Sequence, residues 1–314
     1  MDTSYSYQGF SVQKLEELCD KEHRQAGPCP PVYPLAEQYS QGRIYREYAR
    51  FPMELPLYVY SDHGIHLSAE LRPDERVQKA YAMFSYSRSR FPMLEQSLAP
   101  QPCYRIPHPL VWYRHEHNIE QAKTAKGTIC FPAHSVLGKF AIYDIAEFCR
   151  QLRELPEAMQ PVNICLFMTD IHRGTHLKYL EQGMPVVTAG SVWDIRFVDR
   201  YYDILRNYRY ALSNCIGAYT YYSVEMGMPF SFLAGSCHYK DPQNNELPDE
   251  RAEKKEVEKL FSGIHTSITK QQKNYIAYAF DTKDCISREQ MHEILVRAYA
   301  KYKLDTAGKT VCFN

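Results

Sequence analysis

The sequence has little that indicates a polyanion partner or a membrane protein. Lysine plus arginine and aspartate plus glutamate both number 37, so the formal net charge is zero, and no excess positive charge favours nucleic-acid binding. No run of about 18 apolar residues occurs, and the N-terminus is too polar for a secretory signal. We therefore expect a cytoplasmic protein that does not bind nucleic acid.

The sequence also lacks the cysteine spacings of a disulfide framework or a zinc site. Ten cysteines are scattered along the chain without a Cys-x-x-Cys pair, which favours reduced thiols in the core. His108, His115 and His117 fall within ten residues, but their spacing matches no zinc pattern and no cysteine pair accompanies them. We expect no metal and no cofactor.

The chain is long enough for two domains. It has 314 residues, of which 45% are hydrophobic, so it can bury a large core. The first half contains short apolar runs typical of strands, at residues 57–60, 82–85 and 128–131. The segment 99–109 carries four prolines and is expected to be an irregular connector. A domain boundary is expected near residues 123–127.

The second half alternates between helix and strand patterns. We expect helices at 142–155, 175–182, 197–212 and 218–226, and strands at 162–168, 185–188 and 230–233. Further helices are expected at 253–262, 270–280 and 287–303, the last opened by a capping box of Ser287 and Gln290. Such alternation predicts an α/β fold with a mostly parallel, doubly wound sheet, whose ligands bind beyond the carboxyl ends of the strands.

Polar residues follow the first predicted strand. Asp62 and His63 come directly after residues 57–60, and Gly64 would let a ligand approach the backbone. A carboxylate or an imidazole with a tuned pKa can take a proton from a hydroxyl, so either residue is a candidate general base. The alternative is a turn in which Asp62 caps a backbone amide.

Further candidates follow the strand at 128–131 and begin the helix near residue 218. His134 and Ser135 could donate hydrogen bonds to a phosphate, and the amides at Gly217 would provide a helix N-terminus for the same anion. Thr220 lies near enough to that helix start to contact an anion, whereas Ser223 could instead bond to its own helix. The alternative for His134 is a core histidine.

Two charged residues complete the candidates. Glu225 is in the last turn of its helix, where a carboxylate is disfavoured by about 0.3–1 kcal/mol unless something compensates it, so it either binds ribose hydroxyls or is solvated. Arg173 follows the strand at 162–168 and could pair with a phosphate or a carboxylate. An ordinary surface ion pair is its alternative.

These residues resemble motifs of GT-B glycosyltransferases, in particular the sialyltransferase-like and Kdo-transferase-like enzymes of bacterial surface polysaccharides. Residues 131–135, FPAHS, are similar to the His-Pro motif, with serine in place of the proline. Residues 225–229, EMGMP, are similar to the turn that ends the donor helix, and Thr220 and Ser223 to its paired hydroxyls. Asp62 to Gly64 resembles the acceptor-domain motif, with histidine replacing its second acidic residue.

The resemblance implies two Rossmann-like domains facing a cleft. Residues 1–125 would form a reduced acceptor domain, 126–270 the donor domain, and 271–314 helices that pack across both. The implied activity is metal-independent transfer of a sugar from a nucleotide sugar, with CMP-linked donors as one candidate, to a glycan or lipid-linked acceptor in capsule or lipopolysaccharide synthesis. Peripheral contact with the inner face of the membrane would suit such an acceptor. A sugar-nucleotide epimerase and a non-catalytic nucleotide- or glycan-binding protein are the alternatives.

Overall fold

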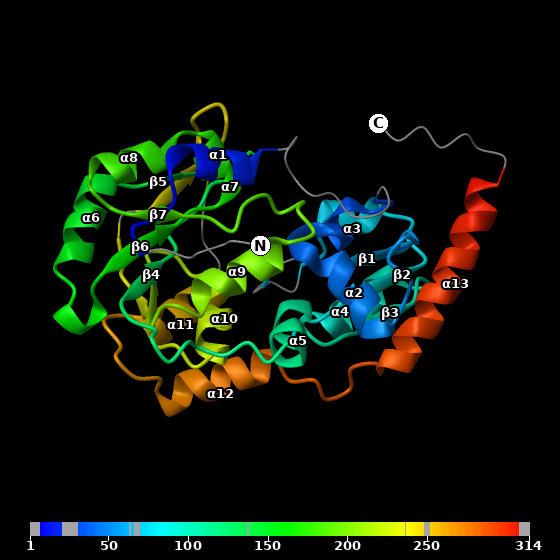
Figure 1. Ribbon diagram of the computed structural model, residues 1–314. Coiled ribbons are helices and arrows are strands. Elements are labelled where there is room, and N and C mark those ends of the chain that lie inside the picture. Colours follow the sequence, from blue (N-terminus) through cyan, green and yellow to red (C-terminus); the bar gives the residue numbers. More distant parts are fainter. Residues whose placement is uncertain are drawn as a thin grey trace. The chain divides into compact units, whose positions relative to one another are not determined.

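The computed structural model describes residues 7–20, 31–62, 64–65, 70–136, 138–235, 237–247 and 252–307 (Figure 1). The chain forms two compact units. Unit 1 comprises Met1–Arg24, Asn118–Val192 and Phe197–Ile276, and unit 2 comprises Gln25–His117, Trp193–Arg196 and Ala277–Asn314. The predicted division after residues 125 and 270 stays a prediction.

Unit 1 is built on a five-stranded parallel sheet. Its strands are β4 (Thr128–Cys130), β6 (Val162–Cys165), β7 (Val186–Val187), β8 (Tyr210–Ser213) and β9 (Phe230–Phe232), in the order β7-β6-β4-β8-β9. Every residue of these strands is buried, as expected for a parallel sheet covered on both faces. The predicted α/β fold with a doubly wound sheet is confirmed.

The helices of unit 1 connect these strands. They are α1 (Val12–Cys19), α6 (Ile145–Arg153), the 3₁₀ helix η3 (Glu157–Met159), α7 (Met168–His172), α8 (Thr175–Glu181), α9 (Phe197–Leu205), α10 (Ala218–Glu225) and α11 (Ala252–Phe261); α12 (Lys270–Ala279) begins in this unit. In Figure 1, α9 and α10 lie together on the near side of the sheet. The helices predicted at 175–182, 218–226, 253–262 and 270–280 are confirmed within a residue or two.

The predicted helix at 197–212 is wrong. It divides into α9, which ends at Leu205, and β8, which begins at Tyr210. Beyond the end of α9, the side chain of Asn207 donates to the carbonyl of Asp203. The four residues of β8 pair with β4 on one side and with β9 on the other. A short apolar run fits a helix or a strand equally well, and only the neighbouring strands decide between them.

Other predicted boundaries also change. The connector at 99–109 contains a strand, β3 (Cys103–Arg105), so its prediction as wholly irregular is wrong. The prolines lie outside the three paired residues, and β3 is an edge strand with a partner on one side only, where proline is tolerated. The predicted strand at 162–168 ends at Cys165, because α7 begins at Met168. The predicted helix at 142–155 shortens to α6.

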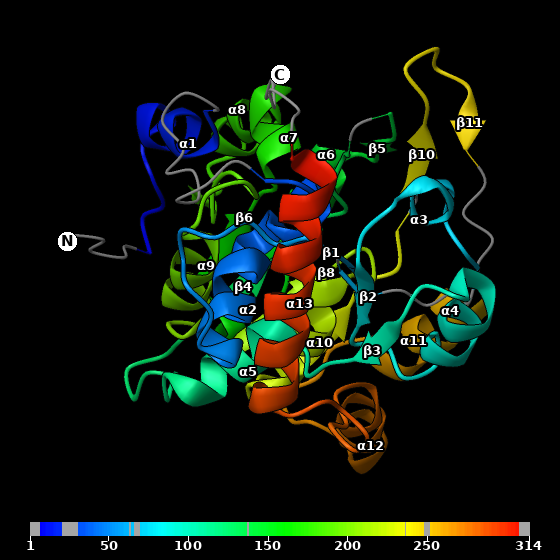
Figure 2. The same cartoon turned by 90° about the vertical axis from the view of Figure 1, so that its right-hand side faces the viewer.

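A second, antiparallel sheet was not predicted. It consists of β5 (Phe140–Ile142), β10 (His238–Lys240) and β11 (Glu246–Leu247), in the order β11-β10-β5, and we call it the mini-sheet. Figure 2 shows its three strands side by side. One strand follows β4 and the other two follow β9, so the mini-sheet joins segments that leave the carboxyl edge of the large sheet.

The N-terminal segment lies along the edge strand β7. The amide of Phe10 donates to the carbonyl of Val186 at 2.8 Å. Gly9 has a φ of +80°, and a Cβ placed on it would come within 2.8 Å of the backbone of Val186. A glycine is therefore required for this close approach, and the segment covers part of an otherwise open sheet edge.

Unit 2 is a smaller α/β structure. Its parallel strands β1 (Val59–Ser61), β2 (Ala82–Ser85) and β3 lie in that order. Its helices are η1 (Pro34–Ala36), η2 (Gln38–Ser40), α2 (Gln41–Ala49), α3 (Pro73–Val77), α4 (Phe91–Leu98), α5 (Pro109–Glu116) and α13 (Arg288–Thr306). Parallel strands connected by helices are what a Rossmann-like unit requires.

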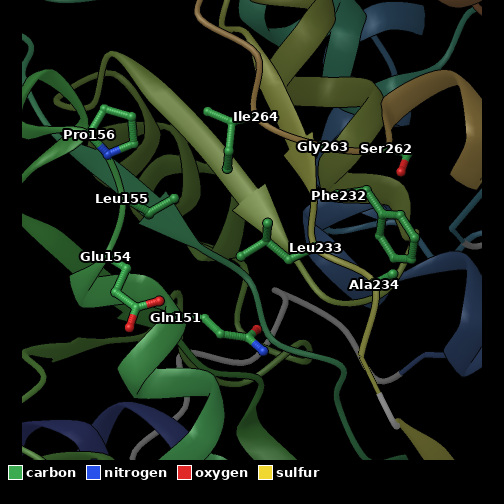
Figure 3. Close-up of a pocket in the computed structure, with 10 residues that line it drawn as sticks. All are labelled: Gln151, Glu154, Leu155, Pro156, Phe232, Leu233, Ala234, Ser262, Gly263 and Ile264. Atoms are coloured by element: carbon green, nitrogen blue, oxygen red, sulfur yellow. The ribbon is translucent and has the colours of Figure 1, made fainter.

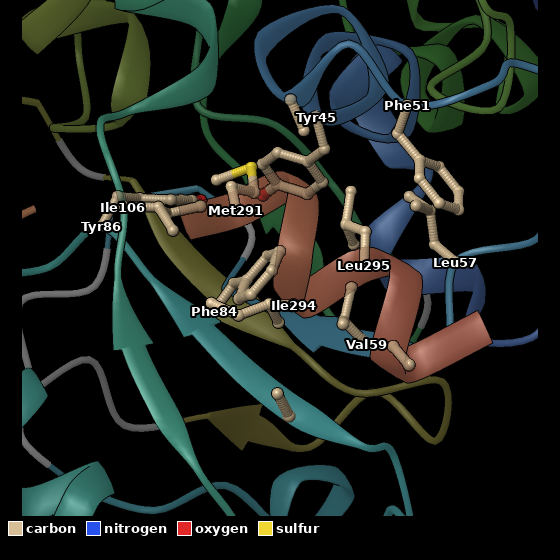
Figure 4. Packing of buried hydrophobic residues seen from close by; sticks show 13 residues of the cluster. Tyr45, Phe51, Leu57, Val59, Phe84, Tyr86, Ile106, Met291, Ile294 and Leu295 are labelled. Atoms are coloured by element: carbon tan, nitrogen blue, oxygen red, sulfur yellow. The ribbon is translucent and has the colours of Figure 1, made fainter. Parts of the chain in front are cut away.

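The core of unit 2 includes α13. Met291, Ile294 and Leu295 pack with Val59 and Phe84 from the strands (Figure 4). The predicted capping box is confirmed, because Ser287 accepts from the amide of Gln290 and Gln290 accepts from that of Ser287. None of the helices in the described ranges is long and apolar enough to cross a membrane.

Candidate functional site

The order of the large sheet reverses between β4 and β8, and two loops meet there. The amide of Ala133, in the loop after β4, donates to Oδ1 of Asn214, in the loop after β8, at 2.7 Å. Both residues are buried. Ligands of doubly wound sheets bind at this point of reversal, beyond the carboxyl ends of the strands. We call it the switch-point site.

Ser135 joins the loop after β4 to two other elements. Its amide donates to both carboxylate oxygens of Asp170, on α7, at 3.2 Å each. Its hydroxyl accepts from the amide of Ala141, on β5, at 3.2 Å. Burial raises the pKa of Asp170 to about 6, against the opposing hydrogen bonds from Ser135 and the charge of Arg173. Ser135 therefore fixes the shape of the site and has less capacity left to bind a phosphate.

His134 lies in the same loop and is half-buried. Its ring centroid lies 4.9 Å from that of Phe167 and 6.5 Å from that of Tyr219. Burial, helped by the nearby charge of Lys139, lowers the pKa of His134 to about 4. The imidazole is therefore neutral at pH 7. No hydrogen bond joins its ring nitrogens to another residue of the described chain, so it can donate one N–H to a ligand.

Gly217 caps α10, as predicted, and the ring of Tyr219 packs against it, which was not predicted. Its backbone is extended, and its amide donates to Oγ1 of Thr220 at 3.4 Å. A Cβ on Gly217 would come within 2.7 Å of the ring of Tyr219. That ring stacks on Phe131 with centroids 5.0 Å apart, and its hydroxyl donates to the carbonyl of Cys215 at 2.8 Å. Tyr219 thus packs beside the start of the helix.

Tyr219 is the residue of this site that sequence reasoning missed. The available signal was the tyrosine cluster at 219–222, which fits an aromatic surface and a core equally well. Thr220 and Ser223 are both fully buried, and the hydroxyl of Ser223 has no hydrogen-bond partner among the described residues. These two side chains face the interior of unit 1 and not its edge.

The structure does not bring Glu225 to the switch-point site. It is the half-buried last residue of α10, whose first residue follows Gly217. Eight helical residues separate the two ends by about 10 Å. The chain then enters β9 at its amino end. Glu225 therefore lies toward the opposite edge of the sheet from His134.

Arg173 lies beside the mini-sheet. It is the exposed C-terminal cap of α7, and its guanidinium carbon lies 3.8 Å from the ring centroid of Phe140, on β5. Its charge lies close enough to Asp170 to oppose the rise in pKa that burial causes there. Arg173 thus adds positive charge near the loops after β4 and β6.

In unit 2, Asp62 directly follows β1 and belongs to a buried ion cluster. Its Oδ1 lies 2.6 Å from Nη1 of Arg90, and it also accepts from the hydroxyl of Ser85. Arg90 pairs with Glu75 at 2.5 Å as well. Burial raises the pKa of Asp62 to about 6 even though Arg90 and Ser85 oppose that shift. His63, the other candidate base, lies outside the described residues.

Neither metal-binding residues nor disulfides mark a different site within the described ranges. No group of three or more histidine, cysteine or acidic side chains there could hold a metal ion. His108 is buried in unit 2, whereas His115 and His117 are exposed on or next to α5. The described cysteines carry free thiols.

A pocket of about 390 Å³ opens elsewhere on unit 1 (Figure 3). Its lining comes from the end of α6, the end of β9 and the segment after α11, and includes Glu154, Leu155, Leu233 and Ile264. Leu233 also bonds to the carbonyl of Ser213, which ends β8. The described lining includes none of the predicted donor-binding residues, so this pocket is not the switch-point site.

Comparison with known proteins identifies no family. The sequence matches no family model and no curated protein. The structure is similar to UDP-GlcNAc 2-epimerase from Neisseria meningitidis bound to UDP-GlcNAc, with 12% identity and a TM-score of 0.35, over 71% of this chain and 62% of that one. It is also similar to accessory secretory protein 1, 2 and 3 of Streptococcus pneumoniae, with 11% identity and a TM-score of 0.32, over 84% and 54%. The chain spans less than two thirds of either, and likenesses of this size assign no function.

Proposed function

We propose that unit 1 binds a nucleotide sugar at the switch-point site and that the protein is a glycosyltransferase. The observation that carries the proposal is the bond between Ala133 and Asn214, which joins the loops after β4 and β8 at the point where ligands of this fold bind. It holds a neutral imidazole, His134, near the start of α10.

The charges around this site suit a phosphate. The N-terminus of α10 presents backbone amides and the positive end of a helix dipole. Lys139 acts on the pKa of His134, and Arg173 acts on that of Asp170, so both cations lie close to the loops. In a transfer reaction these groups would stabilise the negative charge that develops on the departing nucleotide. Ser135 and Thr220 would hold this arrangement rather than contact the ligand.

The acceptor would be deprotonated by a residue of unit 2. Asp62 has a raised pKa, as a general base requires. Because it is buried and paired with Arg90, the hydroxyl of the acceptor would have to approach it at the end of β1. His63 is the alternative base. Glu225 is left out of the proposed donor site because of its place at the far end of α10.

Nucleotide binding followed by turnover tests the proposal. The purified protein is titrated with UDP, CMP and their sugar conjugates by calorimetry, and each conjugate that binds is then followed for hydrolysis, isomerisation and transfer. We expect His134→Ala to weaken binding about tenfold, whereas His115→Ala, an exposed histidine of unit 2, changes nothing. Asp62→Asn and His63→Ala should leave binding intact, and loss of the base should slow transfer by about 100-fold or more.

Each alternative predicts a different result. An epimerase would convert the sugar without an acceptor, and a binding protein would leave the conjugate unchanged. Failure of every nucleotide to bind would refute the proposal as a whole. Binding that His134→Ala leaves unaltered would refute the location of the site.

A further inference from the structure

One buried arginine of unit 2 serves two carboxylates. Nη1 of Arg90 lies 2.6 Å from Oδ1 of Asp62 and 2.8 Å from Oε1 of Glu75, and its Nη2 lies 2.5 Å from Oε2 of Glu75. All three side chains are at most 1% exposed. Arg90 precedes α4, Asp62 follows β1 and Glu75 is on α3, so the cluster ties three segments of unit 2 together.

The two carboxylates share the arginine unequally. Glu75 takes two of its hydrogen bonds, one from each terminal nitrogen, which is the stronger way to pair an arginine with a carboxylate. Asp62 takes one. The positive charge of Arg90 is therefore compensated mainly by Glu75. A carboxylate that accepts fewer charge-assisted bonds remains the stronger base, since each such bond favours its ionised form.

The charges around Asp62 show the same opposition. Burial raises its pKa to about 6, and the charge of Glu75 adds to that rise. Arg90, the hydroxyl of Ser85 and the charge of Arg72 oppose it. Arg72 itself lies 3.2 Å from Glu75, so that carboxylate draws positive charge from two arginines. Glu75 thus limits the effect of both arginines on Asp62.

Two further titratable groups near Asp62 come from other elements. Burial, together with nearby carboxylates that include Asp62, raises the pKa of Tyr45, on α2, and raises that of Cys103, on β3, to about 11. Both groups are therefore neutral near pH 7. They add no charge there, so the arginines and Glu75 set the balance at Asp62.

We propose that Glu75 is a positioning residue for Asp62, because it holds Arg90 by two bonds and so leaves Asp62 able to accept a proton from the acceptor. The inference rests on the proposed function and selects Asp62 over His63 as the base. Arg90 occupies one oxygen of Asp62, so the proton has to arrive at the other, where the hydroxyl of Ser85 donates. Replacing Glu75 by glutamine would leave Asp62 as the ionised partner of Arg90 and make it a weaker base.

Two measurements on Glu75→Gln test this inference. The carboxyl ¹³C resonance of Asp62, assigned by its loss in Asp62→Asn, is followed against pH in the protein without nucleotide. The rate of transfer from the nucleotide sugar that binds is followed over the same pH range. Asp74→Asn is the matched control, because Asp74 is on the same helix but pairs with Arg72, at 3.2 Å.

In the unaltered protein, both the resonance and the rate should change near pH 6. In Glu75→Gln both changes should move down to about pH 4–5, and the rate at pH 7 should fall about tenfold because the base is weaker. Asp74→Asn should move neither. Thermal unfolding checks each variant. If Glu75→Gln does not fold, Glu75→Asp carries the test, since its shorter side chain keeps the charge but not both bonds and should give a smaller shift in the same direction.

Each other outcome overturns the inference. A resonance that does not move means that Arg90 is not shared as described. A resonance that moves while the rate profile stays in place means that Asp62 is not the base. In both cases nucleotide binding at the switch-point site stands. If no nucleotide sugar is transferred at all, the proposed function fails and the inference fails with it.

Discussion

The hydrogen bond between Ala133 and Asn214, which joins the two loops of the switch-point site, allows the stability loss of one variant to be predicted. Asn214→Ala removes the acceptor of the Ala133 amide and leaves the rest of the site in place. Asn214 is 6% exposed and Ala133 is 2% exposed, so water cannot readily replace the lost oxygen. An unsatisfied buried donor costs about 1–3 kcal/mol. We therefore expect the free energy of unfolding of unit 1 to fall by about 2 kcal/mol.

Thermal unfolding followed by circular dichroism measures this loss. For a unit of this size, about 2 kcal/mol lowers Tm by roughly 4–8 °C. Asn207→Ala is the control, since its side chain makes a hydrogen bond at the exposed end of α9. The control should change stability by less than about 0.5 kcal/mol.

Ligand binding provides the second readout. The lost bond also frees the loop that carries His134 from the loop before α10, so UDP affinity should fall in Asn214→Ala and stay unchanged in Asn207→Ala. If Asn214→Ala is as stable as the control, the amide of Ala133 has another partner and the two loops are not held as described. If stability falls but affinity does not, the bond is structural and the ligand binds elsewhere.

Three further predictions concern stability. Leu295→Ala should lower the free energy of unfolding of unit 2 by about 2–5 kcal/mol in urea titrations, because it opens a cavity between α13 and the strands; a loss under about 1 kcal/mol would contradict that packing. Gly127→Ala should lower the free energy of unfolding more than Gly183→Ala. Both glycines have positive φ, +64° and +69°, but a Cβ on Gly127 would lie 2.2 Å from a backbone oxygen, whereas the space at Gly183 is open and only about 1–2 kcal/mol of backbone strain is expected there. Equal losses of stability would mean that the close contact at Gly127 relaxes freely. Asp170 has a pKa of about 6 in the folded protein, above its unfolded value of 3.8, so its protonation favours the folded state most below pH 4. This contribution to the free energy of unfolding falls by about 3 kcal/mol as the pH rises from 4 through 6. Asp170→Asn should flatten that part of the plot of stability against pH, and an unchanged plot would show that the pKa of Asp170 is not raised.

The sequence predicted the doubly wound arrangement because strands and helices alternate from β4 to β9 with clear apolar runs. It failed at β8, because apolar residues continue at helical spacing from α9 through Tyr208 into the next strand. It also failed at the mini-sheet, whose strands have two or three residues and in which β5 pairs with β10, about 100 positions away. A pairing at such a distance leaves no periodic signal in either segment.

The candidate site, like the fold, was predicted only in part. The loop after β4 was identified from its place after an apolar run, and the loop after β8 from its place before a predicted helix; the structure joins them through Ala133 and Asn214. What each side chain does there depends on partners distant in sequence. The partner of Asp62 is Arg90, 28 residues away, and that of Ser135 is Asp170, 35 residues away. No local pattern could indicate either pairing.

The segment that covers β7 affects the order in which unit 1 can be completed on the ribosome. Phe10 is synthesised early, but the strand residue it bonds to, Val186, follows 176 positions later. At about 5–20 residues per second, this segment waits roughly 10–35 s for its partner. Until then the segment around Phe10 has no strand to pair with, and a chaperone or a neighbouring nascent chain can reach it. A fusion placed directly before Tyr7 would therefore act on a step of folding that can take place only after β7 is made, although it is attached to the part of the chain made first.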